Sequence, residues 1–138
     1  MPSWVVSSLI ATASITIMML LFKKLTIHNI SPISINFYFF LLVTAGFFAF
    51  MLIAKAPFSL PASSLWIFVV LAAFAISFNY FEIVAIRDAP NPGFVESITS
   101  FRLVAIALLS TFIFNAELTA KNLAGIVFVI VGLVLIST

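Results

Sequence analysis

The sequence contains no cysteine, one histidine and very little charge. The absence of cysteine excludes disulfide bonds and cysteine-ligated metals. His28 has no partner residues that would complete a metal site, and no cofactor motif is present, so we expect neither a metal nor a cofactor. Only 7% of the 138 residues are charged, against about 25% in a typical soluble domain. The net charge of +2 is too small to indicate a nucleic-acid partner.

Hydrophobic residues, in contrast, make up 64% of the chain. A helix needs about 20 apolar residues to cross the roughly 30 Å of hydrocarbon in a bilayer. Five runs near this length occupy almost the whole sequence, at 4–22, 34–54, 64–86, 93–114 and 120–137. The prolines of the central part fall between the runs, where they do not interrupt a helix. The sequence therefore predicts an all-α membrane protein, with residues 1–138 forming one domain of five transmembrane helices.

Three ionisable residues lie inside the predicted spans: Glu82, Glu96 and Arg102. A charge near the bilayer centre costs about 2.5–3.5 kcal/mol on insertion scales, so such residues are usually paired or face a cavity. Arg102 lies about 13–14 Å into the fourth span, at 1.5 Å per residue. Glu82 and Asn79 share one face of the third span at depths of about 7 and 12 Å. Because the connection between these spans is short, the spans are expected to be antiparallel neighbours, and this face can meet Arg102.

A polar stripe on the fourth span extends from Glu96 to Thr99 and Ser100, at helical spacings of three and four. We predict that these residues line an aqueous cavity that binds a charged solute or a coupling proton. The alternative is that Glu82 and Arg102 form a buried ion pair that only joins two helices. The predicted substrate- or proton-binding residues are Asn79, Glu82, Glu96, Thr99, Ser100 and Arg102.

The C-terminal run 117–125 carries a recognisable pattern, in which Glu117 ends one membrane helix, a short linker follows, and a final helix has Gly125 and Gly132 seven apart. This pattern resembles the EamA-type domain of the drug/metabolite transporter superfamily. Trp4 and Lys24 bracketing the first span extend the similarity, as does the apolar helix pair at 89–114. Many EamA domains have a proline in the fourth helix, which this sequence lacks. The resemblance implies one five-helix half of a transporter, since larger members contain two such domains in inverted orientation.

A dimer is expected from the span count as well. Alternating access is commonly built from two inverted repeats around a midplane site, and an odd number of spans places the termini on opposite sides of the membrane. The basic residues divide almost evenly, with Lys23, Lys24 and Arg87 on one side and Lys55 and Lys121 on the other. We therefore expect either a homodimer, for which an antiparallel arrangement is one option, or a heterodimer with a second half.

The sequence thus predicts a secondary transporter for a small polar or amphipathic metabolite, in the cytoplasmic membrane of a bacterium or archaeon. Two alternatives remain open: a non-transporting scaffold or regulatory subunit of a larger membrane complex, and a subunit of a lipid-linked sugar flippase. An enzyme is not expected, because no nucleophile with a base, metal cluster or phosphate-binding loop is evident.

Overall fold

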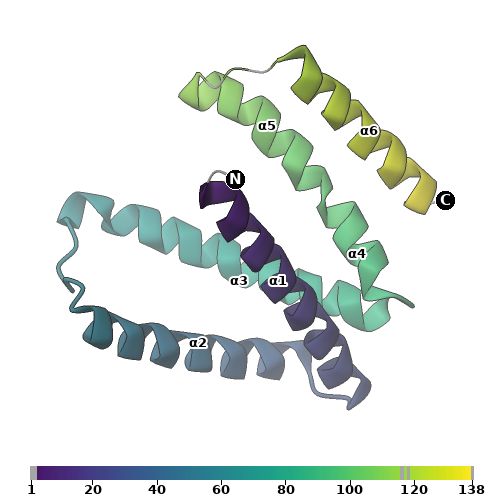
Figure 1. Ribbon diagram of the computed structural model, residues 1–138. Helices are drawn as coiled ribbons and strands as arrows, with labels where there is room; N and C mark the ends of the chain where they lie inside the picture. The colour runs from purple at the N-terminus through teal and green to yellow at the C-terminus, as the bar shows by residue number, and fades with distance from the viewer. Residues whose placement is uncertain (1–2, 116, 118, 138) are drawn as a thin grey trace. The chain divides into compact units, whose positions relative to one another are not determined.

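The computed structural model describes residues 3–115, 117 and 119–137, and in this part of the chain every regular element is a helix (Figure 1). The helices are α1 (Ser3–Ile27), α2 (Pro32–Ala54), α3 (Leu65–Asp88), α4 (Pro92–Thr99), α5 (Phe101–Phe114) and α6 (Ala120–Ser137), and a short 3-10 turn, η1 (Ala62–Ser64), precedes α3. The prediction of an all-α membrane protein is confirmed.

Four segments of the described chain are long and apolar enough to cross a membrane: Ser3–Ile27, Pro32–Ala54, Ala62–Asp88 and Pro92–Phe114. The last helix adds a shorter apolar stretch, Ala120–Gly132. Large apolar side chains lie on the outside of these helices, as shown by the exposed fractions of Ile53 (79%) and Phe112 (83%). Such a surface is stable when hydrocarbon covers it, and the helices satisfy their backbone hydrogen bonds internally, as lipid requires.

Polar residues and prolines define the helix ends. Ser31 caps α2, with its hydroxyl oxygen accepting a hydrogen bond from the Ser34 amide (3.2 Å), and Pro32 occupies the first turn. Asn91 caps α4 in the same way through the Gly93 amide (2.8 Å), again followed by a proline. Proline suits this position because the amide that it lacks has no partner inside the helix. The first helix continues five residues beyond its apolar run, to Ile27.

The chain forms two compact units, Met1–Asp88 and Ala89–Thr138. In the first unit α1 and α2 both pack on α3. Buried residues there include Met19 and Phe22 on α1 and Ile83 and Ile86 on α3. The Phe22 ring also meets the Phe39 ring of α2 edge-on, with centroids 5.3 Å apart. In the second unit α6 packs along both α4 and α5.

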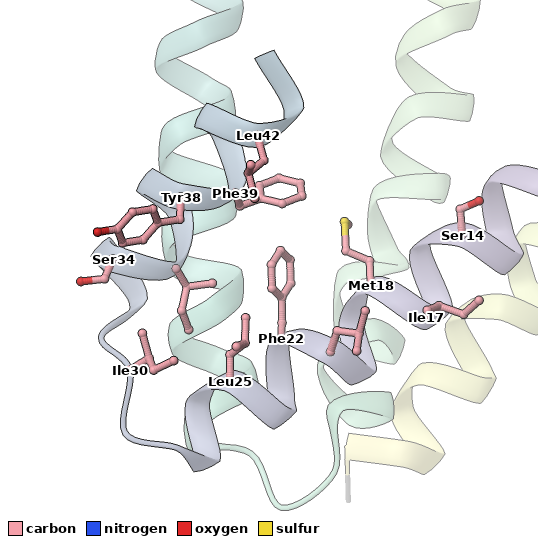
Figure 2. Close-up of a pocket in the computed structure, with 12 residues that line it drawn as sticks. Ser14, Ile17, Met18, Phe22, Leu25, Ile30, Ser34, Tyr38, Phe39 and Leu42 are labelled. Carbon is pink, nitrogen blue, oxygen red and sulfur yellow. The ribbon is translucent and has the colours of Figure 1, made fainter. Parts of the chain in front are cut away.

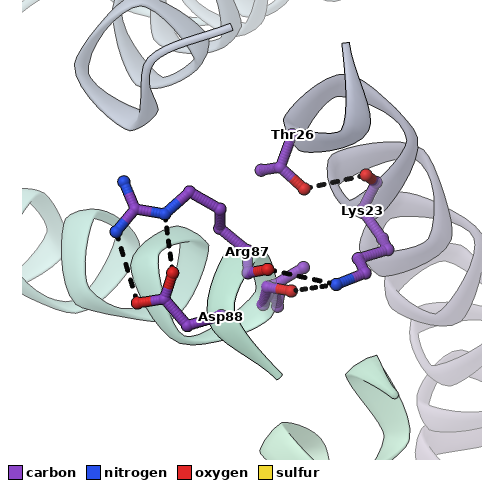
Figure 3. A network of polar contacts seen from close by, with 5 residues as sticks. Lys23, Thr26, Arg87 and Asp88 are labelled. Carbon is purple, nitrogen blue, oxygen red and sulfur yellow. Dashed lines mark hydrogen bonds and ion pairs between the residues drawn. The ribbon is translucent and has the colours of Figure 1, made fainter. Parts of the chain in front are cut away.

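A lysine joins the end of α1 to the end of α3 (Figure 3). The Lys23 Nζ donates hydrogen bonds to the carbonyl oxygens of Ile86 (2.9 Å) and Arg87 (3.2 Å), in the last turn of α3. These carbonyls have no partner within the helix and carry the negative end of its dipole, so a cation is favoured there. Beside them Arg87 and Asp88 form an exposed ion pair with an Nε to Oδ1 distance of 2.8 Å. The Lys23 contact therefore fixes α1 against α3 at one end of the first unit.

Replacing Lys23 by methionine is expected to lower the free energy of unfolding by about 1–3 kcal/mol, because two charge-assisted hydrogen bonds are lost and the carbonyl of the buried Ile86 is left without its donor. The matched control is Lys24→Met, which removes the same charge from the exposed neighbouring residue. Thermal unfolding of both purified variants in one detergent checks this. Equal melting temperatures for the two variants would show that the contact does not stabilise the unit.

Candidate functional site

The fourth predicted span is interrupted at Ser100. Residues 93–114 were expected to form one regular helix, but the structure divides them into α4 and α5 at this one residue (Figure 1). The backbone of Ser100 stays right-handed helical (φ −61°, ψ −15°), so the interruption is a local tightening of the helix within one candidate span. The Leu103 amide donates to the Ser100 carbonyl, three residues back, at 2.9 Å. This is the tight hydrogen-bond pattern of a 3-10 turn. Three predicted site residues, Glu96, Thr99 and Arg102, lie within four residues of the interruption.

Three donors converge on the backbone carbonyl of Glu96. They are the Ser100 amide (2.9 Å), the Ser100 hydroxyl (2.6 Å) and the Thr99 hydroxyl (3.2 Å). The predicted polar stripe of Glu96, Thr99 and Ser100 is thus brought together in the structure, but through the main chain of Glu96 and not through its carboxylate. Both hydroxyls are committed as donors within the helix, and their oxygens stay available only as acceptors.

The carboxylate of Glu96 has one buried oxygen, Oε1, that accepts no hydrogen bond from the described residues. An acceptor without a donor, away from water, costs several kcal/mol in hydrocarbon. Arg102 lies in the first turn of α5 and is exposed. Glu96 and Arg102 therefore flank the interruption, with the acidic group before it and the basic group after it.

The two remaining predicted residues lie on α3, in the first unit. Asn79 is half-buried, and its Nδ2 donates to the Ala75 carbonyl at 2.9 Å. Glu82 is 4% exposed and precedes Ile83, which is fully buried. The two residues share a helix face, as expected from their spacing of three. Glu82 belongs to one compact unit and Arg102 to the other, so their pairing stays a prediction.

Two apolar grooves lie within the first unit. The groove between α1 and α2, of about 480 Å³, is lined by residues such as Phe22, Tyr38 and Phe39, which are drawn as sticks in Figure 2. The groove between α2 and α3, of about 620 Å³, contains Asn36, Thr44 and Tyr80 among apolar residues. None of the six predicted site residues lines either groove. Their size and apolar lining suit the hydrocarbon part of an amphipathic molecule.

Asn36 is a polar residue that the predicted site does not include. Its Nδ2 donates to the Pro32 carbonyl (2.9 Å), while its Oδ1 is buried and accepts no hydrogen bond from the described residues. The only signal in the sequence is an isolated amide early in an apolar run. No three histidine, aspartate or glutamate side chains in residues 3–115, 117 and 119–137 are grouped so that they could hold a metal ion.

Comparison with protein families decides the class of this molecule, since residues 2–138 match the model of the EamA-like transporter family. The chain belongs to that family. This EamA-like protein is therefore an integral membrane protein of the drug/metabolite transporter type, and the resemblance read from the sequence is confirmed. A search of curated proteins and of solved structures gave no match.

The C-terminal pattern of this EamA-like chain has a structural role at the start of α6. Thr119 caps that helix: its hydroxyl oxygen accepts from the Asn122 amide (3.3 Å) and its carbonyl from the Leu123 amide (3.0 Å). Glu117 is exposed in the linker. Leu118, also part of the pattern, lies outside the described residues. A polar residue precedes α6 because Thr119 provides a hydrogen-bond acceptor for an amide of the first turn.

The predicted pairing of Glu82 with Arg102 is testable by a double-mutant cycle. Arg102→Gln is expected to lower the free energy of unfolding by about 3 kcal/mol, because it leaves the buried carboxylate of Glu82 without its counterion. Glu82→Gln should cost less, because the charge that it leaves, on Arg102, is exposed. The double variant should fall short of the sum by about 1–3 kcal/mol. The control cycle combines Arg102→Gln with Glu117→Gln, in the exposed linker, and should be additive. Additivity in both cycles, measured by denaturant unfolding, contradicts the pairing.

Proposed function

We propose that this EamA-like protein is a secondary transporter that moves a small polar or amphipathic metabolite by alternating access, working as a dimer of five-helix halves. The observation that carries the proposal is the interrupted fourth span, with Glu96 before the interruption and Arg102 after it. Irregular backbone at membrane depth is tolerated where it is buried in protein or lines a water-filled cavity. Discontinuous helices form the substrate and ion sites of many secondary transporters, and the single tight turn at Ser100 is a smaller departure from the α-helical pattern of the same span.

The charges around the interruption suit a solute with an anionic group. Arg102 provides a guanidinium that binds a carboxylate or phosphate through two parallel hydrogen bonds. Glu96 or Glu82 balances that charge or carries a coupling proton, and the buried Oε1 of Glu96 offers an acceptor to a substrate donor or a proton. Asn79 supplies a neutral amide on the face of α3 that carries Glu82. Membership of a transporter family supports transport over a purely structural use of these charges.

The functional unit in this proposal is a pair of halves. Two copies in opposite orientation generate the inverted repeat that alternating access commonly uses, and a cognate second half would serve equally. The near balance of basic residues between the two sides favours insertion in both orientations. The expected location is the cytoplasmic membrane of a bacterium or archaeon.

Replacing Arg102 by glutamine is expected to reduce transport about 10–100-fold, the equivalent of one or two charge-assisted hydrogen bonds to the substrate. The protein is reconstituted in liposomes, and a panel of radiolabelled amino acids and dicarboxylates is supplied under an inward proton gradient. The matched control is Lys121→Gln, which removes a charge from an exposed residue in the first turn of α6. An Arg102→Gln protein that transports like the control contradicts the role of Arg102.

The same liposomes distinguish the two carboxylates. The variant of the proton carrier, Glu82→Gln or Glu96→Gln, should lose uptake driven by the proton gradient but retain exchange of labelled for unlabelled substrate. This follows because an amide cannot gain or release the proton, while exchange needs no net proton movement. Retention of gradient-driven uptake by both variants would exclude proton coupling through either residue.

The antiparallel homodimer predicts dual insertion. Single cysteines at His28 and Ser59, exposed in the connections at opposite ends of α2, should each be labelled in part when intact cells are treated with a membrane-impermeant maleimide, and fully after permeabilisation. The chain has no native cysteine to interfere. Complete labelling of one position and none of the other from outside would contradict the antiparallel homodimer and require an inverted partner chain.

A further inference from the structure

The interruption between α4 and α5 needs a physical cause, because the sequence 93–114 contains no proline. Sharp changes in a helix arise at proline, at glycine or serine, or where a side chain enters the hydrogen-bond ladder. The third cause applies here, since the hydroxyls of Thr99 and Ser100 both bind the Glu96 carbonyl. Serine and threonine that donate to the preceding turn are known to bend helices.

In the described helices outside this turn, a single hydroxyl of this kind leaves the helix continuous. Ser97 donates to the Gly93 carbonyl at 2.8 Å within α4, and Thr111 donates to the Ala107 carbonyl at 3.2 Å within α5. Both helices continue through these positions. Hydroxyls on α1 make the same bond in an unbroken helix, as at Thr12 and Thr16.

The Glu96 carbonyl differs because it accepts from two hydroxyls and one amide. A carbonyl oxygen has two lone pairs, so three donors share two directions. The Ser100 amide keeps its α-helical bond to this carbonyl at 2.9 Å, and Ser100 stays in the right-handed helical region. The bond from the Leu103 amide to the Ser100 carbonyl then replaces the α-helical pattern in the next turn. The crowded carbonyl and the tight turn together account for the interruption.

The interruption bears on the direction of the Arg102 side chain. In a continuous α-helix Arg102 would be about 120° away from Glu96 around the axis, since each residue advances 100°. A residue in a 3-10 turn advances about 120° instead. Each residue wound in this way turns the following side chains by about 20° relative to Glu96. The tight turn at Ser100 therefore changes the angle around the axis between the positions of Glu96 and Arg102.

We propose that Thr99 and Ser100 are positioning residues and not substrate ligands: by binding the Glu96 carbonyl they maintain the interruption that sets the direction of Arg102 relative to Glu96. The effect on transport rests on the proposed function, whereas the effect on the helix does not. The hydroxyls take the place that a proline would have in this span, with one difference. A hydroxyl can release the carbonyl and bind it again, so the interruption is reversible.

The test measures the helix directly. Nitroxide labels are placed on cysteines at Phe94 and Phe112, exposed residues on the two sides of the interruption. Their distance distribution is measured by pulsed electron paramagnetic resonance in the reconstituted full chain. In a continuous helix the two Cα atoms are about 27 Å apart, from 18 residues at 1.5 Å each. The Thr99→Val/Ser100→Ala protein should shift from the wild-type distribution to that of a continuous helix, and Ser100→Ala alone should shift part of the way.

Two matched variants complete the experiment. Ser97→Ala removes an equivalent hydroxyl about one turn earlier and should not change the distance distribution. Ser100→Thr keeps the hydroxyl and should also show the wild-type distance distribution. An unchanged distribution in both the double variant and Ser100→Ala overturns the inference.

The same variants are then tested for uptake of the amino acid and dicarboxylate panel. The rate of uptake by the double variant should fall about 10-fold, whereas Ser100→Thr should keep the wild-type rate. If the variants are equally stable, a merely structural role of the hydroxyls predicts no such difference in uptake. A shifted distribution with wild-type uptake overturns the positioning role. A shifted distribution with no uptake by any protein, wild type included, overturns the proposed function while leaving the hydroxyl-maintained interruption established.

Discussion

The structure depends on one constraint: in hydrocarbon a backbone amide or carbonyl must find its partner within the protein. The long uninterrupted helices follow from it, and so does the placement of Pro32 and Pro92 in first turns, where no amide is needed. The hydroxyls along α1 donate hydrogen bonds to carbonyl oxygens of the preceding turn. The last carbonyls of α3 obtain the Lys23 ammonium. Where a membrane span departs from this regularity, as at Ser100, the departure has a free-energy cost and calls for a functional explanation.

The same constraint distinguishes ionisable groups that have a structural partner from those that do not. Lys23 has a structural partner, the end of α3, which accounts for its position at the end of α1. Glu96 is different, because its main chain accepts three donors while a buried oxygen of its carboxylate accepts none from the described residues. A residue retained only for packing would be better replaced by leucine, since buried ion pairs stabilise less than well-packed apolar groups. The contrast favours a solute or a proton as the partner of Glu96.

The helical class was predictable from hydropathy because lipid permits few other structures, and the start of α6 at Ala120 agrees with the predicted run. The end of α1 was not predictable in this way, since the apolar run ends before Lys23 while the helix continues to Ile27. Hydropathy records transfer into lipid, whereas the helix end depends on backbone conformation at Asn29, which has a positive φ of 58°. The interruption at Ser100 also escaped prediction, because it arises from several donors sharing one carbonyl. Spacing placed Glu96, Thr99 and Ser100 on one stripe, but it did not show that the hydroxyls bind the main chain.

The contact of Lys23 with Ile86 has a consequence for synthesis, since 63 residues separate the two. A chain emerging from the ribosome delivers α1 and α2 long before the end of α3 is made. Lys23 must therefore wait, hydrated at the membrane surface, through the synthesis of two further helices. The contact that closes the first unit therefore forms only after all three of its helices have been made.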